Sequence, residues 1–391
     1  MSARRLQLVV LGMMGRAPFA GQTWLYLNWL RGLHRLGHDV YYVEDDSVWP
    51  YDPVAETVTD DCRYAVEHID RSMRAIGLGD RWAFRLADRE GACWGASESE
   101  LRARYESCDA LLNIVGATDL RADQLRAPLR VYVETDPVGS QLRLAQGDPH
   151  TREAFANHHV IATYGENYGA PDCDVPLDGR EYVRTRQPVD LELWPMAYDP
   201  DARLFTTIGN YRQEGCDVEW QGSLYRWSKH HEWERFMALP AHTGQDFEMA
   251  LMHSLASDRE RLRAAGWRLV PSLEMSLDTF GAYPRYIRAS RGEFTVAKDQ
   301  NVRLRSGWFS ERDACYLASG KPVVTQDTGF SNILPTGVGL FAVQDLDGAA
   351  EAIAQINADY HRHCEAARAI AAEYFDAARV AGALLDAVGL A

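Results

Sequence analysis

Two α/β patterns follow each other along the chain, and each alternates short apolar runs with amphipathic stretches. The first begins with the apolar run 6–11, which ends at a glycine and predicts a buried parallel strand. A helix is predicted from Gln22, with apolar residues spaced along one face from Trp24 to Leu33 and with Gly37 placed for the C-cap. A second strand is predicted at 40–43. Strand, glycine loop, helix and strand form one right-handed βαβ unit.

The same alternation continues through the rest of the sequence. In the first half, it predicts strands at 110–115, 131–134 and 160–163 and helices at 60–75 and 98–106. In the second half, it predicts strands at 204–208, 247–252, 267–270, 293–296, 323–325 and 340–343, a short helix that opens at Ser310, and further helices at 229–237, 257–265, 276–289, 349–356, 360–374 and 377–388. Alternation of this kind predicts doubly wound sheets.

The chain is too long for one ordinary core, since it has 391 residues. The stretch 165–187 loses periodicity and gathers glycine, proline and charge, and we interpret it and the residues up to Pro195 as the crossing between two domains. We therefore predict one Rossmann-like domain over residues 1–190 and a second over residues 191–375.

Composition and charge narrow the classes of function. The chain is 46% hydrophobic and 25% charged, as in soluble globular proteins, and its net charge of −15 argues against a partner such as nucleic acid or an anionic membrane. Seven scattered cysteines favour a reducing compartment. No apolar run reaches eighteen residues, and Gly12 to Pro18 cuts off the N-terminal run. We expect a cytoplasmic protein without a transmembrane segment.

The most informative segment runs from Arg305 to Gln326. It predicts a tight glycine turn, a short helix from Ser310, a break at Gly320 to Pro322 and a buried strand. A turn that leads into a helix N-terminus presents unpaired N–H groups and the positive end of the helix dipole, which suits a phosphate. A plain N-cap is the alternative role for Ser310, because Asp313 stands where a capping box has an acid or amide.

This segment resembles the donor-phosphate segment of two-domain (GT-B) nucleotide-sugar glycosyltransferases. Ser306-Gly307-Trp308-Phe309-Ser310 is similar to their glycine-tryptophan-serine turn, and 317–324 is similar to their small-residue, glycine, proline, valine run. The resemblance implies an α/β fold of two Rossmann-like, doubly wound parallel-sheet domains that face a cleft, with a terminal helix in 376–391 that crosses back to the first domain. It also implies glycosyl transfer from a nucleotide-activated sugar to a small-molecule or glycan acceptor, with the donor as substrate and no further cofactor.

The donor side is predicted at the carboxyl ends of the strands of the second domain, where ligands sit in open parallel sheets. Gly209 and Asn210 end the first of these strands. We predict that they and the turn 306–310 hold a nucleoside diphosphate through backbone amides, with Arg226 or Lys229 as cationic support. An ordinary turn at Gly209 and a solvated Lys229 are the alternatives.

One position departs from the pattern of the resembling enzymes. They carry a glutamate for the ribose hydroxyls five residues before the glycine of the Gly-x-Pro step, where this chain has Cys315, and a thiol is a poor acceptor. Either Glu311, one turn earlier, replaces it, or the ribose is held otherwise. The resemblance also places Asp327, with Gly329 in the same loop, at the sugar hydroxyls, although an Asp-x-Gly turn explains Asp327 equally well.

The first domain offers the acceptor side and the candidate bases. The loop from Gly12 to Gly15 is a weak match to a glycine-rich phosphate loop and, with Gln22, is predicted to border the acceptor. Inverting relatives often carry a catalytic histidine there, and this loop has none. Asp136 and then Glu166 are therefore the candidate general bases, since each follows a predicted strand and an acid suits the task if burial raises its pKa. A turn role is the alternative for each.

No metal site is predicted. The Asp345-Leu346-Asp347 pattern precedes a helix, where acids favour the dipole, and the paired histidines lack i, i+4 spacing. Three other functions stay open: a sugar-nucleotide epimerase of the same fold, a non-catalytic nucleotide-sugar-binding relative, and a nicotinamide-dependent enzyme that uses the loop from Gly12 to Gly15.

Overall fold

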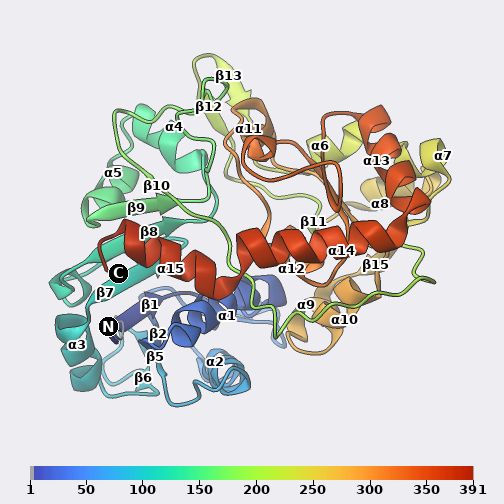
Figure 1. The fold of residues 1–391 in the computed structure, drawn as a ribbon. Helices are drawn as coiled ribbons and strands as arrows, with labels where there is room; N and C mark the ends of the chain where they lie inside the picture. Colours follow the sequence, from blue (N-terminus) through green and yellow to red (C-terminus); the bar gives the residue numbers. More distant parts are fainter. Residues whose placement is uncertain (1–3, 391) are drawn as a thin grey trace.

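A computed structural model describes residues 4–390 and shows two α/β domains, each built on a parallel sheet (Figure 1). The first sheet has the order β10-β9-β8-β7-β1-β2-β5-β6, and β6 alone runs antiparallel to its neighbour. Its strands are β1 (Gln7–Leu11), β2 (Asp39–Asp46), β5 (Trp82–Leu86), β6 (Cys93–Trp94), β7 (Ala110–Ile114), β8 (Arg130–Glu134), β9 (Val160–Thr163) and β10 (Val183–Arg184). The chain winds outward from β1 in both directions, as a doubly wound sheet does.

The second sheet has six parallel strands in the order β15-β14-β11-β16-β17-β18. They are β11 (Phe205–Asn210), β14 (Phe247–Met252), β15 (Arg268–Pro271), β16 (Gly292–Thr295), β17 (Val323–Gln326) and β18 (Leu340–Val343). Two small antiparallel hairpins lie outside the main sheets: β3 (Tyr51–Asp52) with β4 (Thr57–Val58), and β12 (Val218–Trp220) with β13 (Ser223–Tyr225).

Helices cover the sheets and connect their strands (Figure 1). Those between the strands of the first sheet are α1 (Ala20–Arg35), α2 (Arg63–Ala75), α3 (Glu98–Ser107), α4 (Gly139–Ala145) and α5 (Pro149–Ala156), with the 3-10 turn η1 (Gln124–Arg126). The later ones are α6 (His230–Arg235), α7 (Leu239–Thr243), α8 (Ala256–Ala264), α9 (Leu273–Leu277), α10 (Ala282–Ala289), α11 (Asp299–Arg303), α12 (Glu311–Ala318), η2 (Phe330–Asn332), α13 (Leu346–Ala358), α14 (Tyr360–Ile370), the π-turn η3 (Ala371–Phe375) and α15 (Ala377–Ala387).

The predicted helix 276–289 is wrong as a single element. The structure has α9 and α10 there, and the carboxylate of Asp278 accepts the N–H groups of Gly281 (3.0 Å) and Ala282 (2.7 Å) between them. Strand β5 was not predicted, because Arg85 interrupts its apolar run. That guanidinium is buried and forms two hydrogen bonds with the carboxylate of Asp45, at 2.7 and 2.8 Å, which makes the position compatible with a core strand.

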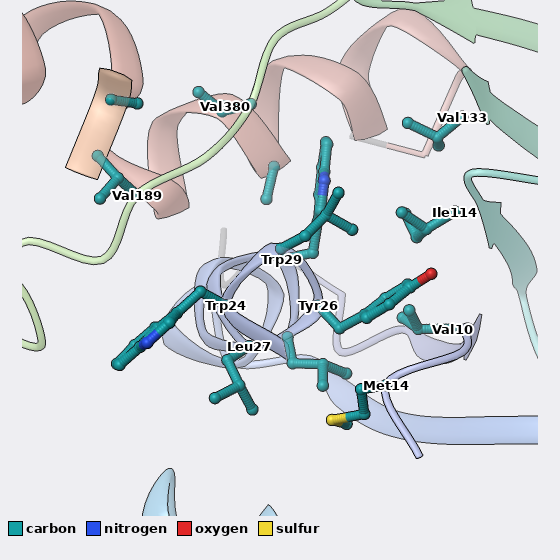
Figure 2. Packing of buried hydrophobic residues seen from close by; sticks show 14 of the residues in the cluster. Val10, Met14, Trp24, Tyr26, Leu27, Trp29, Ile114, Val133, Val189 and Val380 are labelled. Carbon is teal, nitrogen blue, oxygen red and sulfur yellow. The ribbon is translucent and has the colours of Figure 1, made fainter. Parts of the chain in front are cut away.

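The chain passes between the domains twice, and the two crossings lie side by side. The Val189 N–H donates to the carbonyl of Phe375 (2.7 Å), and the Ala377 N–H donates to the carbonyl of Val189 (3.0 Å). Helix α15 then packs on α1 so closely that a Cβ on Gly32 would collide with the backbone of Ala377. Figure 2 shows Val380 of α15 on one side of α1 and Val10 of β1 on another side of it.

Candidate active site in the cleft between the domains

A cavity of about 460 Å³ opens between the two domains. In the second sheet, β11 lies between β14 and β16, so the loops after β11 and β16 leave the point where the strand order reverses, which is the usual ligand position in such sheets. The cavity wall from the first domain includes Phe19, Gly21, Gln22, Val115, Thr135, Asp136 and Tyr164. The opposite wall includes Gly209, Asn210, Gln213, Lys229, Lys298, Trp308, Ser310, Glu311, Arg312 and Cys315.

The N-terminus of α12 faces this cavity without a cap. Ser310 is the N-cap residue and has the extended conformation of one, but its side chain accepts no capping hydrogen bond. Within residues 4–390, the N–H groups of Glu311, Arg312 and Asp313 also have no acceptor. The positive end of the α12 dipole and its unpaired donors are therefore available to an anion in the cavity.

Lys229 is a cation without an acidic partner in the described part of the chain, and it lines the same cavity. Its ammonium lies 5.3 Å from the centre of the Trp308 ring. Burial, helped by the neighbouring charge of Arg312, lowers the pKa of Lys229 to about 7. An anionic ligand would favour the charged form of this side chain.

Arg312 lies beside Lys229 but is already bound by the protein. Its Nε donates to the carboxylate of Glu293 (2.5 Å), and its two terminal nitrogens donate to the carbonyl of Ile208 (2.7 Å) and the hydroxyl of Thr295 (2.9 Å). These bonds join α12 to β11 and β16. Arg312 thus fixes the position of the helix start and adds positive charge to the cavity wall.

Asp136 and Lys298 form an ion pair that connects the two domains across the cavity. The ammonium of Lys298 also lies 3.0 Å from the centre of the Trp227 ring, and burial lowers the pKa of this lysine although Asp136 opposes the shift. The second carboxylate oxygen of Asp136 is buried and has no hydrogen-bond partner among the described residues. A second link between the domains runs from Trp308 Nε1 to the carbonyl of Thr135 (3.0 Å).

Glu311 and Cys315 both line the cavity, one helical turn apart on α12. Burial raises the pKa of Glu311 well above its ordinary range, and one of its carboxyl oxygens is buried without a partner in the described structure. Burial also raises the pKa of the Cys315 thiol. Glu311 therefore lies at the cavity. That it binds the ribose hydroxyls in place of the missing glutamate stays a prediction.

The turn Ser306–Gly307 does not offer the predicted amide donors. The N–H groups of Ser306 and Gly307 donate to the carbonyls of Asn301 (3.3 Å) and Thr328 (2.8 Å). The Trp308 N–H donates to the Ser306 hydroxyl (3.2 Å). The turn instead packs against the first domain: Gly307 lies so close to Asn167 that a Cβ would collide with the backbone of that residue. Gly307 also has a φ of +82°. The available donors lie one turn later, at the start of α12.

Asp327 and Gly329 are also not among the residues of the cavity wall, and the predicted sugar contact stays a prediction. The Asp327 carboxylate accepts the Gly329 N–H (2.9 Å) and the Ser331 hydroxyl (3.0 Å) and pairs with Arg305 (3.2 Å). Gly329 adopts a φ of +94° that the turn requires. These hydrogen bonds are those of the alternative role, an Asp-x-Gly turn.

Glu166 and Arg226, two other predicted site residues, do not line the cavity. Glu166 forms an ion pair with Arg186 (2.6 Å), and although that cation opposes the shift, burial raises the pKa of Glu166. Arg226 is exposed and contacts a ring nitrogen of His231 at 3.0 Å. The structure thus separates both from the cleft and leaves Asp136 and Lys229 there.

In the acceptor-side loop, only Gln22 of the three predicted residues lines the cavity. A Cβ on Gly12 would collide with the rings of Tyr42 and Tyr26, and the Gly15 N–H donates to the carboxylate of Glu44 (2.5 Å). The loop is therefore filled by the side chains of its own domain. Its glycines serve close packing, which the weak motif match did not distinguish from ligand binding.

From the sequence, Lys298 could lie at the cleft or only cap its strand and loop, and neither Trp308 nor Arg312 was singled out as a contact of the cavity. Lys298 follows directly after the buried residues at the end of β16, and a lysine at the carboxyl end of a central strand was the available signal. Trp308 and Arg312 lie inside the motif that was singled out, but their contacts with Thr135 and Glu293 depend on distant parts of the chain.

Among residues 4–390, no three His, Cys, Asp or Glu side chains are grouped so that they could hold a metal ion. No helix in the same range has the length and apolar character that a membrane crossing needs. Metal independence stays a prediction.

The fold is that of a two-domain GT-B protein, as predicted. No protein-family model matches the sequence, and no curated protein matches it. Solved structures do match: an alpha-glucosyltransferase in complex with UDP and a 13-mer DNA has a TM-score of 0.59 at 10% identity, covering 98% of this chain and 99% of that one. At such low identity the likeness shows the fold alone.

Two further solved structures share the fold along nearly the whole chain. Anabaena Alr3699/HepE, in complex with UDP and glucose, has a TM-score of 0.55 at 10% identity and covers 98% of this chain and 99% of its own. AviGT4, a glycosyltransferase involved in avilamycin A biosynthesis, has a TM-score of 0.54 at 14% identity, with coverage of 97% and 96%. The GT-B architecture implied by the motif resemblance is confirmed.

Proposed function

We propose that the protein is a glycosyltransferase that moves a sugar from a nucleotide-activated donor to a small-molecule or glycan acceptor. The observation that carries the proposal is the uncapped N-terminus of α12, which faces the interdomain cavity beside Lys229, a cation with no acidic partner among the described residues. Proteins of the same fold crystallised with UDP, or with UDP and glucose, support a nucleotide donor.

The diphosphate of the donor is placed at the start of α12. The N–H groups of Glu311 and Arg312 and the ammonium of Lys229 would donate to its oxygens, with Gly209 and Asn210 bordering it from the end of β11. When the bond to the sugar breaks, negative charge grows on the departing diphosphate, and fixed donors stabilise that charge more than they stabilise the bound donor. Glu311 is placed at the hydroxyls of the nucleotide.

Asp136 is the proposed general base if the reaction inverts the anomeric centre. Its unpartnered oxygen would accept the proton of the acceptor hydroxyl while the hydroxyl oxygen forms its bond to the anomeric carbon. The bond from that carbon to the diphosphate breaks in the same step, and the diphosphate leaves with the electron pair. Lys298, which pairs with the other oxygen, holds Asp136 at the cavity.

Charge and hydrogen-bond donors also bear on the need for a metal ion, on nucleic acid as a partner and on the location of the protein. Backbone amides and Lys229 supply positive charge at the phosphates, so we propose transfer without a metal ion. One protein of this fold was crystallised with DNA, but the net charge of −15 opposes such a partner here. The scattered cysteines, all free among the described residues, support a cytoplasmic location.

Ser310→Asp tests the donor site. The substitution adds a carboxylate where the phosphates are placed, so it should abolish the thermal shift produced by nucleoside diphosphates while the fold is kept, as judged by circular dichroism. Ser97→Asp, at the N-cap of α3, is the matched control because it adds the same charge at a helix start that does not line the cavity. An unchanged shift in Ser310→Asp would refute the site.

Asp136→Asn tests the base. It should lower turnover by about 10²- to 10⁴-fold, the usual range for general base catalysis, without weakening nucleotide binding. Glu166→Gln should keep turnover within a few-fold, because Glu166 is bound to Arg186 away from the cavity. Single-turnover rates with both variants decide the point, and full activity in Asp136→Asn would exclude it as the base.

A further inference from the structure

The hairpin of β3 and β4 exposes an unusual concentration of apolar side chains. Four large hydrophobic residues in this short stretch are more than half exposed: Val48 (56%), Trp49 (52%), Val54 (81%) and Val58 (57%). Single exposed apolar residues are common on protein surfaces, whereas a group of them marks an interaction surface. Val58 is the member of this group that lies in the paired strands, opposite Tyr51.

The hairpin contacts one residue of the cavity wall, Phe19, through aromatic stacking. Val58 lies directly opposite Tyr51 in the β3–β4 pair, so the two side chains share one face of the hairpin. The Tyr51 ring stacks on the ring of Phe19, with centroids 5.8 Å apart and an interplanar angle of 28°. Phe19 in turn lines the interdomain cavity. We call Phe19, Tyr51 and Val58 the apolar strip.

The apolar strip is attached to the first domain, opposite the proposed donor site. The Tyr51 N–H donates to the carbonyl of Arg16 (3.0 Å), and the Thr59 N–H donates to the carbonyl of Pro50 (3.0 Å). The donor groups at α12 and Lys229 belong to the second domain. A molecule on the strip would therefore reach the cavity from the acceptor side.

The charges around the hairpin restrict what can lie on the strip. Five acids occur in or beside it, and these are Asp46, Asp52, Glu56, Asp60 and Asp61. Three arginines offset part of this charge: Arg16 pairs with Asp46 (3.1 Å), Arg63 with Asp61 (2.5 Å) and Arg89 with Asp60 (3.8 Å). The local balance is negative, like that of the whole chain, so a phosphorylated ligand or an anionic bilayer is disfavoured.

We propose that the apolar strip binds the non-sugar part of the acceptor, an uncharged small molecule with an aromatic or branched aliphatic group. The hydroxyl of this molecule would point past Phe19 into the cavity, toward Asp136. The assignment rests on the proposed function and narrows its acceptor from any small molecule or glycan to this chemical class.

Two variants of adjacent residues test the strip. Val58→Asn places an amide on it, whereas Thr57→Asn makes the same change on the opposite face of the hairpin, where Thr57 faces Asp52. The probe is 2-phenylethanol, compared with glycerol, and its binding is measured by saturation-transfer NMR with and without UDP. Loss of one apolar contact should weaken 2-phenylethanol binding about fivefold in Val58→Asn and leave Thr57→Asn like the wild type.

Each other outcome overturns the proposal. Equal binding of 2-phenylethanol and glycerol by the wild type, equal losses in the two variants, or no loss in either would show that the strip holds no apolar group. Co-sedimentation of the wild type with phosphatidylcholine vesicles, lost in Val58→Asn, would assign the surface to a membrane instead. If UDP does not bind, the proposed function fails, while the probe measured without UDP still decides the strip.

Discussion

The loop from Gly12 to Gly15, after β1, and the segment that leads from Gly307 into α12 both contain backbone N–H groups that could bind an anion. The structure uses these two sets of N–H groups in opposite ways. In the first domain, the N–H groups of Gly15 and Arg16 donate to the buried carboxylate of Glu44, at 2.5 and 3.0 Å. In the second, the N–H groups at the start of α12 have no acceptor among residues 4–390. The protein supplies its own anion to the first set of donors and leaves the second set open.

The difference teaches that glycine spacing does not locate an anion site by itself. The loop from Gly12 to Gly15 has the glycines, but Tyr42 and Glu44 from the neighbouring strand fill the space beside them. The start of α12 lacks a glycine in its first turn and still presents unpaired donors to a cavity. What identifies the site is a set of N–H groups without a protein acceptor beside Lys229, which has no acidic partner, within the part of the chain that the structure describes.

Glu44→Ala should have the largest effect on stability. It removes the acceptor of two N–H groups and one of the two acidic partners of the buried Arg16, which keeps Asp46, so it should lower the free energy of unfolding by about 3 to 5 kcal/mol. Urea unfolding measures the loss, and Glu44→Gln should give a smaller one. The comparison breaks if Glu44→Ala unfolds like the wild type and loses nucleotide binding instead, because the loop would then be the ligand site.

A pair of glycine variants sharpens the comparison within the second domain. Gly307→Ala should lower the free energy of unfolding by about 2 to 4 kcal/mol, since Gly307 has a positive φ and lies against the backbone of Asn167. Gly209→Ala should leave stability nearly unchanged, because the nearest atom to its Cβ would be the Arg312 side chain at 3.5 Å. Thermal unfolding distinguishes them, and equal losses would contradict the structural role assigned to Gly307.

Lys229→Met should weaken binding of a nucleotide sugar by about tenfold to a hundredfold, the range for losing one hydrogen bond to a charged group. The pH profile gives a second signature. The pKa of Lys229 is lowered to about 7, so the side chain is charged below that pH and loses its proton above it. Affinity should therefore fall as pH rises through about 7 in the wild type.

Isothermal titration with a nucleotide sugar measures both effects, because its esterified phosphates do not change charge near neutral pH. In Lys229→Met the fall in affinity around pH 7 should disappear. Lys321→Met is the matched control, since Lys321 is a buried lysine that does not line the cavity. A pH profile that survives in Lys229→Met would mean that another group titrates at the phosphates.

The fold was predictable because its signals are local. Apolar runs such as 6–11 and 247–252 coincide with β1 and β14, and the predicted final helix is α15. The site was predictable only in part, because pairing is not local. The Gly307 N–H donates to the carbonyl of Thr328, and Glu166 forms an ion pair with Arg186. The sequence around Gly307 and Glu166 indicates neither of these partners. For the same reason the sequence left Lys298 between a place at the cleft and a capping role, since its pairing with Asp136 is not local.

The double crossing at Val189 and Ala377 has a consequence for how the chain is made. Helix α15 belongs to the first domain by its packing on α1, although almost the whole second domain precedes it in the sequence. A ribosome therefore releases the first domain with the face of α1 around Gly32 uncovered, and keeps it so until residues 377–387 emerge. While the second domain is being synthesised, this apolar face of α1 stays exposed. Chaperone binding or rapid synthesis is then needed to prevent aggregation through it.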